Sequence, residues 1–392
     1  MARFIPLSIP NFEGNEKKYV DDAIAQGWVS TGGAYISELE KRMAEFLHVD
    51  NVAACQSGTS ALHLALVEAG VRPGDVVLVP PLTFIAAVNP VRYQFATPVF
   101  IDCDDSFCMD PVKLRQFCGE ECIWKEDQLT YKGRIVRAIV VVHVFGNMAD
   151  MEAIMRVAEK YHVKVIEDAT EALGTCYTEG VYAGRFAGTI GDFGAYSFNG
   201  NKIITTGGGG AITAKNSQTV DHIRYLSTQA KDDTHYYIHH EVGYNYRMTN
   251  LQAAVGVAQM EELPEFIRRK RRNYQLYKQQ LQDFSLGRLM EFREGTSSNQ
   301  WFYSLEIDRT KIHASMRDII TKLEEHGIQT RAIWGLINEQ VPYQKEVTFH
   351  LEKAPYYAKR IINLPCSTQI TEEEIKYVVT QVKEVLGEFA NE

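Results

Sequence analysis

Residues 138–168 read AIVVVHVFGNMADMEAIMRVAEKYHVKVIED, and this stretch decides the fold class. The runs Ala138–Val144 and Val163–Asp168 are rich in β-branched side chains, as buried strands are. The segment Met151–Tyr161 between them has the apolar spacing of a helix. Continuous β-branched runs separated by helices indicate a largely parallel sheet that helices cover on both faces.

The same alternation fills the first two-thirds of the chain. Further strands are expected at 51–55, 75–80, 97–102, 192–198 and 210–214, with a helix at 57–69. Together these segments predict an α/β large domain, residues 1–254, with a mostly parallel seven-stranded sheet. After that point the pattern changes to helices at 249–263 (ending at Pro264), up to 281, 312–326 and 372–389, with a strand at 301–307. This predicts a smaller α+β domain, residues 255–392.

The bulk composition excludes several classes of protein. The 392 residues are 45% hydrophobic and 23% charged, with a net charge of −9, which argues against a nucleic-acid-binding protein with a broad cationic face. The basic run 268–272 follows acidic residues in a helical pattern and is interpreted as a solvated helix face. The seven cysteines form no C-x-x-C pair, so neither a metal site nor a disulfide framework is expected. No signal peptide or membrane-spanning run is recognised, which predicts a cytoplasmic protein.

Lys202 lies in a window that favours chemistry over solubility. It ends the run SFNGNK (197–202), and four glycines follow at 207–210. No carboxylate occurs within five positions on either side. A lysine that lacks both water and a counter-ion loses its proton readily and becomes a nucleophile, as a Schiff base requires. A surface lysine before a glycine-rich turn is the alternative, and this window alone leaves it open.

Two further features suggest what such a lysine would bind. Ser57-Gly58-Thr59 lies where a strand meets a helix, which makes an anion site or an ordinary N-cap. Asp168 ends a buried strand, where a carboxylate needs a partner such as a protonated ring nitrogen, or caps the next segment. Neither a P-loop nor a G-x-G-x-x-G motif is present. Pyridoxal phosphate (PLP) needs a lysine, an acid and a phosphate site, so the three features together favour a PLP protein.

At this point the sequence resembles the PLP-dependent nucleotide-sugar aminotransferases of the DegT/StrS type, within the fold type I, aspartate-aminotransferase-like superfamily. The resemblance covers essentially the whole chain. Its segments are 27–32 (GWVSTG), 57–62 (SGTSAL), 81–84 (PLTF), 142–146 (VHVFG), 166–169 (IEDA), 197–202 (SFNGNK) and 243–248 (GYNYRM).

The resemblance implies a role for each matching residue. Lys202 would be joined to the cofactor and would carry protons between the cofactor and C4 of the sugar, and Asp168 would pair with the pyridinium nitrogen. The remaining cofactor contacts would be Gly58, Thr59 and Ser197 at the phosphate, Phe84 stacked on the ring, Glu171 near the phenolic oxygen and Asn245 reaching the phosphate from a partner subunit. Such a shared site implies a homodimer. The residues expected to contact the substrate are Trp28, Ser30, His143 and Arg247.

Two departures from the common family pattern bear on the substrate. Thr170 and Glu171 follow the Asp-Ala pair where many relatives have Ala and then Gln or His, so Glu171 would have to be protonated or shielded. The lysine window reads Phe-Asn-Gly-Asn-Lys where many relatives have a His-Pro or similar sequence. Both features are similar to the branch that makes 4-amino-4,6-dideoxy-N-acetylhexosamines for bacillosamine- and legionaminic-acid-type glycans. The resemblance therefore implies a UDP-linked 4-keto-6-deoxy-N-acetylhexosamine as substrate and glutamate as amino donor.

Several alternatives stay open at this stage. A PLP-dependent sugar dehydratase of the same fold is one of them, but enzymes of that kind carry histidine in place of the lysine, so Lys202 argues against it. A non-catalytic PLP- or nucleotide-sugar-binding regulator, or an aminotransferase for another nucleotide ketosugar, would retain the same residues. His143 ends a buried strand, and a core histidine is as good an interpretation as a substrate contact.

Overall fold

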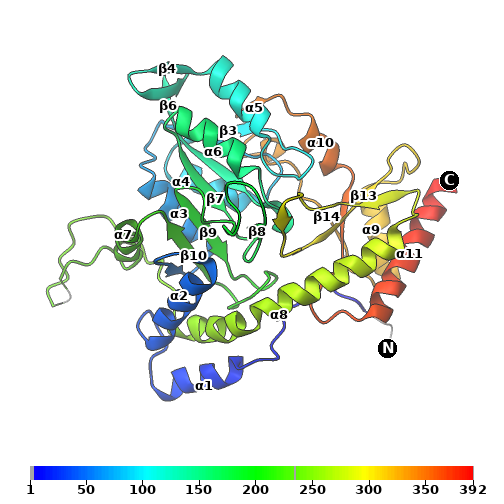
Figure 1. The fold of residues 1–392 in the computed structure, drawn as a ribbon, viewed down its shortest axis with the longest axis horizontal. Coiled ribbons are helices and arrows are strands. Elements are labelled where there is room, and N and C mark those ends of the chain that lie inside the picture. The colour runs from blue at the N-terminus through cyan, green and yellow to red at the C-terminus, as the bar shows by residue number, and fades with distance from the viewer. Residues whose placement is uncertain (1–3, 234, 392) are drawn as a thin grey trace.

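The computed structural model describes residues 4–233 and 235–391. A mixed sheet forms the centre of the larger part of the molecule (Figure 1). Its strands run, in spatial order, β1 (Ala53–Cys55), β10 (Gly210–Ala214), β9 (Phe193–Ser197), β7 (Lys164–Asp168), β6 (Arg134–Val142), β2 (Val76–Val79), β3 (Thr97–Ile101) and β15 (Val347–Phe349). From β9 to β15 every pair is parallel, and only β10 runs against its two neighbours. The predicted α/β class is confirmed.

The sheet is wider than predicted. Its first seven strands in spatial order are the seven that the sequence indicates. Three more join them: β15 at one edge, and the hairpin of β4 (Ile123–Lys125) and β5 (Gln128–Tyr131), which pairs with the start of β6. These short strands lack the long β-branched runs on which the prediction depended.

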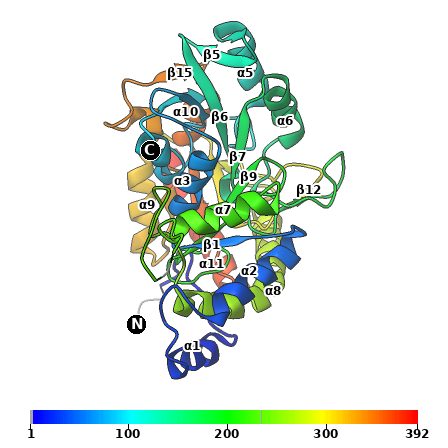
Figure 2. The same ribbon diagram turned by 90° about the vertical axis from the view of Figure 1, so that its left-hand side faces the viewer.

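The unit 138–168 forms as predicted. Val142 pairs with Asp168 in parallel register, and α6 (Met151–Lys160) connects the two strands. The Asp150 carboxylate caps that helix by accepting the Ala153 N–H at 3.0 Å. Figure 2 shows the strands between α3 (Gly58–Glu68) on one side and α6 on the other. The carboxyl ends of β7 and β9 are thereby left free to form a site.

The remaining helices cover the sheets or join the two parts of the molecule. They are α1 (Glu16–Ala25), α2 (Ala34–Leu47), α4 (Asn89–Tyr93), α5 (Pro111–Gln116), α7 (Ser217–Ser227), α8 (Asn250–Leu281), α9 (Met316–Glu325), α10 (Lys353–Ala358) and α11 (Glu372–Asn391). A second, antiparallel sheet has the order β11 (Gly287–Leu289), β13 (Tyr303–Ile307), β16 (Ile361–Leu364) and β14 (Arg331–Ala332). A small pair, β8 (Cys176–Tyr177) and β12 (Thr296–Ser297), links the two regions.

The predicted helix end at Pro264 is wrong. Helix α8 runs unbroken through this proline, from a capping box at Thr249 to Leu281. A proline removes one N–H donor, and here Leu263 and Phe266 beside it are buried and hold the helix in place. Residues 254 and 255 both lie inside α8, which packs on α1 and α2 near one end and on α11 near the other (Figure 1). The domain boundary at this point therefore remains a prediction.

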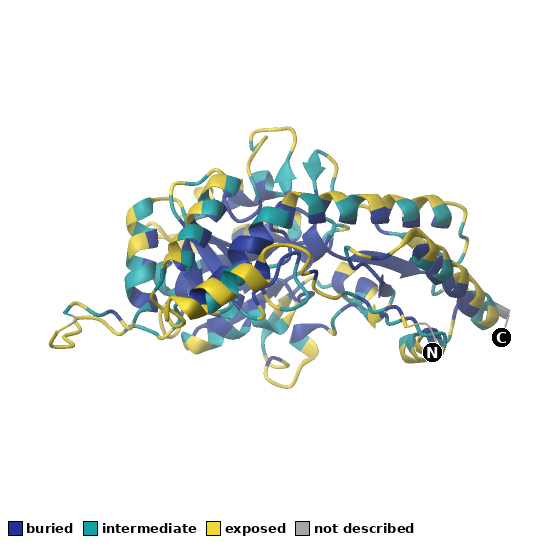
Figure 3. Ribbon diagram, turned by 90° about the horizontal axis from the view of Figure 1, so that it is seen from below, coloured by how far each residue is buried: buried dark blue, intermediate teal, exposed yellow. Residues whose placement is uncertain are grey.

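The loop after α7 extends away from the rest of the molecule (Figures 1 and 3). Large apolar side chains of this loop are exposed, among them Tyr236 (80%) and Val242 (84%). Clusters of exposed apolar side chains are a common feature of surfaces that contact another molecule. Separately, no helix within 4–233 and 235–391 combines the length and apolar character needed to cross a membrane.

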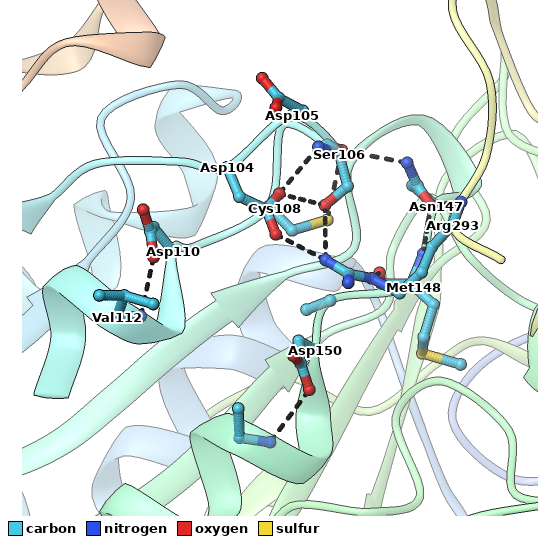
Figure 4. A network of polar contacts seen from close by, with 12 residues as sticks. Asp104, Asp105, Ser106, Cys108, Asp110, Val112, Asn147, Met148, Asp150 and Arg293 are labelled. Carbon is cyan, nitrogen blue, oxygen red and sulfur yellow. Dashed lines mark hydrogen bonds and ion pairs between the residues drawn. The ribbon is translucent and has the colours of Figure 1, made fainter. Parts of the chain in front are cut away.

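Arg293 joins the smaller part of the molecule to the loop after β3 (Figure 4). Its guanidinium donates to Asp104 Oδ2 at 2.6 Å, to Ser106 Oγ at 3.1 Å and to the Met148 carbonyl at 2.8 Å. The side chains of Arg293 and Asp104 are each only 24% exposed, so water cannot fully replace these contacts. The junction therefore ties β3 to the segment between β11 and β12.

We expect Arg293→Met to lower the free energy of unfolding by about 2–3 kcal/mol, because the partly buried Asp104 loses its charged partner. Urea unfolding of both proteins measures this change. The matched control is Arg268→Met: Arg268 is 66% exposed and pairs with Glu265 on its own helix, so its loss should cost less than about 1 kcal/mol. Equal losses in the two variants would contradict a structural role for the junction.

Candidate active site

A cavity of about 550 Å³ lies at the carboxyl ends of the central strands. Residues that the sequence singled out converge on it from four separate segments of the chain. Those that line the cavity are Gly58, Thr59, Phe84, Asp168, Glu171, Ser197 and Lys202. These seven residues therefore meet around one cavity, although they are up to about 140 positions apart in the sequence.

The first turn of α3 forms one end of the cavity. Ser57 caps the helix by accepting the Ser60 N–H at 3.0 Å, so it is an N-cap, and the adjoining residues also line the cavity. The first amides of a helix, here at Gly58 and Thr59, have no intrahelical acceptor and favour an anion. A Cβ at Gly58 would lie 2.8 Å from Ser197 Cβ, so glycine allows the two segments to meet. This end has the chemistry of a phosphate site.

Asp168 lies at the end of β7, on the wall of the cavity, and is only 3% exposed. Its Oδ1 accepts the backbone N–H of Thr170 at 3.1 Å. Burial raises the pKa of this carboxyl, while the hydrogen bonds from Thr170 and the charge of Lys202 oppose the rise. A positively charged N–H in the cavity would be a favourable partner for this carboxylate.

Lys202 has a neighbouring carboxylate that its sequence window did not reveal. Its Nζ lies 3.7 Å from Glu171 Oε1, and its side chain is 13% exposed. The expectation that this lysine lacks a counter-ion is therefore wrong, because the loop after β7 brings in a glutamate from 31 positions away.

Glu171 is buried away from water. A glutamate beside the phenolic oxygen of PLP, where the resemblance places it, would have to be shielded in this way. Its Oε2 accepts the backbone N–H of Phe145 at 2.7 Å. Burial raises the pKa of Glu171 to about 7, although the charge of Lys202 acts in the opposite direction. Near neutral pH the side chain therefore exchanges a proton readily.

These residues fit PLP. The cavity combines a primary amine, a buried carboxyl and a helix N-terminus with small hydroxyl side chains, which are the three groups that this cofactor uses. Phe84 is 55% exposed on the cavity wall, where a flat aromatic ring could cover it.

His143 does not reach the cavity, and its interpretation as a substrate contact is wrong. It is fully buried, and its Nε2 lies 2.8 Å from Glu167 Oε2. Its Nδ1 accepts the Ala149 N–H at 3.2 Å, so both ring nitrogens are used inside the protein. It is a core histidine that fixes the end of β6.

The other expected substrate contacts also lie outside this cavity. Arg247 pairs with Glu40, and the amides of Asn250 donate to the carbonyl oxygens of Trp28 and Ser30. Asn245 is exposed near the base of the extended loop. Within one subunit none of the four lines the cavity, so any contact that they make with a ligand there would have to involve another subunit.

The sequence did not indicate the residues that the smaller part of the molecule contributes. Trp301, Arg331, Trp334 and Asn363 all line the cavity. They follow Lys202 by about 100 residues or more, and no local pattern marks them. Trp301 contacts the expected cofactor-binding amine, since Lys202 Nζ lies 4.2 Å from its ring centroid.

A parallel sheet whose strand ends hold a lysine, a buried carboxyl and an anion site defines a PLP-dependent enzyme of the aminotransferase fold. Residues 10–383 match the model of the DegT/DnrJ/EryC1/StrS aminotransferase family, and the chain belongs to this family. It is therefore a PLP-dependent sugar aminotransferase.

The similarity to individual proteins extends over nearly full lengths. The chain is 36% identical to GDP-perosamine synthase of Caulobacter vibrioides over 384 residues, covering 97% of this chain and 98% of that protein. The crystal structure of DesI with its TDP-sugar product superposes with a TM-score of 0.86 at 26% identity, covering 98% and 94% of the two chains. The aminotransferase TlmJ of Streptoalloteichus hindustanus gives 0.88 at 25% identity, covering 98% and 99%.

Replacing Glu171 by glutamine is expected to change how stability depends on pH. Burial raises the folded-state pKa from its ordinary value of 4.5 to about 7, so the folded protein binds a proton that the unfolded chain releases between these values. The stability contributed by this proton is complete below pH 4.5 and is lost as pH rises through about 7. Glu171→Gln should therefore gain about 2 kcal/mol relative to the native sequence between about pH 5.5 and pH 8.

Urea unfolding of the cofactor-free proteins at several pH values tests this prediction. Glu265→Gln is the control, because Glu265 is partly exposed and the pKa of its carboxyl is lowered to about 2 by Arg268 and Arg269. A stability difference between Glu171→Gln and the native sequence that stays constant with pH would show that Glu171 does not titrate in this range.

Proposed function

We propose that this protein transfers the amino group of glutamate to C4 of a UDP-linked 4-keto-6-deoxy-N-acetylhexosamine. The reaction would serve bacterial glycans of the bacillosamine or legionaminic acid type and would take place in the cytoplasm. The observation that carries the proposal is the meeting of Lys202, Asp168 and the first turn of α3 around one cavity. The Thr170-Glu171 pair and the Asn199-Gly200-Asn201 segment support the N-acetylated branch.

In this proposal bound PLP supplies an electron sink that makes the C–H bond next to the transferred nitrogen acidic. Lys202 Nζ holds the cofactor at rest and, once free, moves a proton at the reacting carbon. The Asp168 carboxylate holds a positive charge at the far end of the ring. The amides at Gly58 and Thr59, with Ser197, bind the phosphate, and Phe84 covers the ring.

The extended loop supports the homodimer in this proposal. The loop carries exposed apolar side chains and, near its base, Asn245, and none of these residues lines the cavity around Lys202 in its own subunit. Asn245 of one subunit would complete the phosphate site of the other. Analytical ultracentrifugation of the native protein and of a Tyr236→Ser/Val242→Ser variant would test whether the loop joins two subunits.

Arg331 is the group that we assign to the glutamate carboxylate. It lines the cavity, and among the described residues no hydrogen bond or ion pair engages its guanidinium. A guanidinium binds a carboxylate through two parallel N–H donors. We expect Arg331→Met to lower kcat/KM for glutamate about 30-fold while kcat/KM for the sugar changes less than about threefold. Equal losses for both substrates would contradict this assignment.

A panel of nucleotide sugars tests the substrate. Purified protein with PLP and ¹⁵N-glutamate is incubated with UDP-, GDP- and TDP-linked 4-keto-6-deoxy sugars, with and without a 2-acetamido group, and the product is identified by NMR. Conversion of the UDP-linked N-acetylated sugar at the highest kcat/KM is expected. Preference for a GDP-linked sugar, the candidate that 36% identity to GDP-perosamine synthase favours, would overturn the proposal.

A further inference from the structure

The indole of Trp301 lies against the amine of Lys202. The distance from Nζ to the ring centroid is 4.2 Å, well within the range of a cation–π interaction. Trp301 is 3% exposed, so water competes little for the ammonium at this face. The same ammonium lies 3.7 Å from Glu171 Oε1, so two side chains from distant segments hold it.

Hydrogen bonds at three points, one on the indole and two on the backbone, fix Trp301. Its Nε1–H donates to the carbonyl of Asn201, the residue before Lys202, at 2.7 Å. Its backbone N–H donates to Asn299 Oδ1 at 3.0 Å, and its carbonyl accepts from Lys270 Nζ at 2.8 Å. The ring also stacks on Phe302, with centroids 4.0 Å apart and planes 10° from parallel. The indole therefore cannot turn away from Lys202 without breaking several contacts.

The same network holds the loop that carries Glu171. Asn299 Nδ2 donates to the carbonyls of Glu171 and Leu173, both at 3.0 Å. A Cβ at Gly146 would lie 2.0 Å from Asn299 Oδ1, so only glycine leaves room for this amide. Asn299 is therefore hydrogen-bonded to Trp301 and to the loop of Glu171, the two residues that contact the Lys202 ammonium. These bonds also hold the smaller part of the molecule against the carboxyl ends of the strands.

The two contacts respond differently to pH. Glu171 titrates close to neutrality, because burial raises its pKa to about 7, and protonation removes its attraction for a cation. An indole has no charge to lose in this range. The ring therefore holds the ammonium both when Glu171 carries a proton and when it does not.

We propose that Trp301 is a positioning residue for Lys202, whose amine it holds beside Glu171 through the face of its indole. This inference rests on the proposed function of Lys202 as the cofactor-binding amine. It matters whenever the amine is free, because the ring then holds Nζ inside the cavity through a contact that only the ammonium makes. Removing the ring should therefore remove an interaction that distinguishes the ammonium from the neutral amine.

Competitive labelling of the amine tests the proposal without cofactor or sugar. The native protein, stripped of PLP, is treated with a trace of acetic anhydride across a range of pH, and the labelling of Lys202 relative to the exposed Lys215 is measured by peptide mass spectrometry. In Trp301→Leu we expect the pH profile of Lys202 labelling to move to lower pH by about one unit, since a cation–π contact contributes about 0.5–2 kcal/mol. Trp301→Phe should give a smaller shift.

The control is Trp334→Leu, which removes another indole from the wall of the same cavity. An equal shift in this control, or an unchanged profile in Trp301→Leu, would overturn the proposal. So would labelling that rises equally at every pH, because this is the result of greater access alone. If Trp301→Leu fails to fold, Trp301→Phe, which keeps an aromatic ring in the stack, decides by the same criterion. The labelling needs neither a sugar nor turnover. A failure of the Trp301 proposal can therefore be told apart from a failure of the proposed reaction.

Discussion

Replacing Lys202 by alanine is expected to lower kcat about 10⁴-fold, the largest loss that any single substitution in this protein should cause. The variant loses both the amine that binds the cofactor and the base that moves the proton. No other lysine lines the cavity among the described residues, so nothing replaces it. Stopped-flow turnover with glutamate and a ketosugar measures the loss.

Three controls make the result specific to Lys202. Lys215→Ala removes a lysine that is half exposed and paired with Asp192, and should leave kcat unchanged. Lys202→Arg keeps a positive charge but not a nucleophilic amine, and should be as inactive as Lys202→Ala. Borohydride reduction of the native protein with PLP should attach the cofactor to the peptide that contains Lys202 and to no other. Full turnover by Lys202→Ala would refute the proposed mechanism.

The sequence predicts the large sheet, and the edge of it at which the cavity lies, because both depend on local patterns. The β-branched run that ends at Asp168 defines a strand, and in a parallel sheet the end of that strand is also the place for a ligand. The glycine and hydroxyl residues at 57–59 similarly mark a helix start. These signals require only the neighbouring residues, so a single sequence contains them.

The rest of the site depends on tertiary contacts that no local pattern records. Trp301 reaches Lys202 only because Lys270 and Asn299 hold it there. Glu171 becomes the neighbour of Lys202 because the loop after β7 folds back over the strand ends. His143 shows the opposite error: its place at a strand end suggested a ligand contact, and the buried Glu167 engages it instead.

Asp168→Asn is expected to lower kcat about 10²–10³-fold. Asparagine has the shape of aspartate, but it cannot hold a full positive charge on the ring nitrogen of the cofactor. The ring then withdraws electrons less strongly when the proton is removed at the reacting carbon. The rate of that proton transfer, measured with glutamate deuterated at Cα, should fall, and its isotope effect should rise toward the full value.

The stability of the same variant separates this electrostatic role from a structural one. Burial raises the pKa of Asp168, so its charge is a cost in the empty protein, and Asp168→Asn should unfold at the same urea concentration or a higher one. Asp150→Ala, which removes the side-chain cap of α6, is the complementary control and should lose stability while its kcat is unchanged. A PLP analogue with a methylated ring nitrogen carries a permanent positive charge and should restore part of the activity of Asp168→Asn. If Asp168→Asn instead keeps kcat within fivefold of the native value, the carboxylate is not the partner of the ring nitrogen.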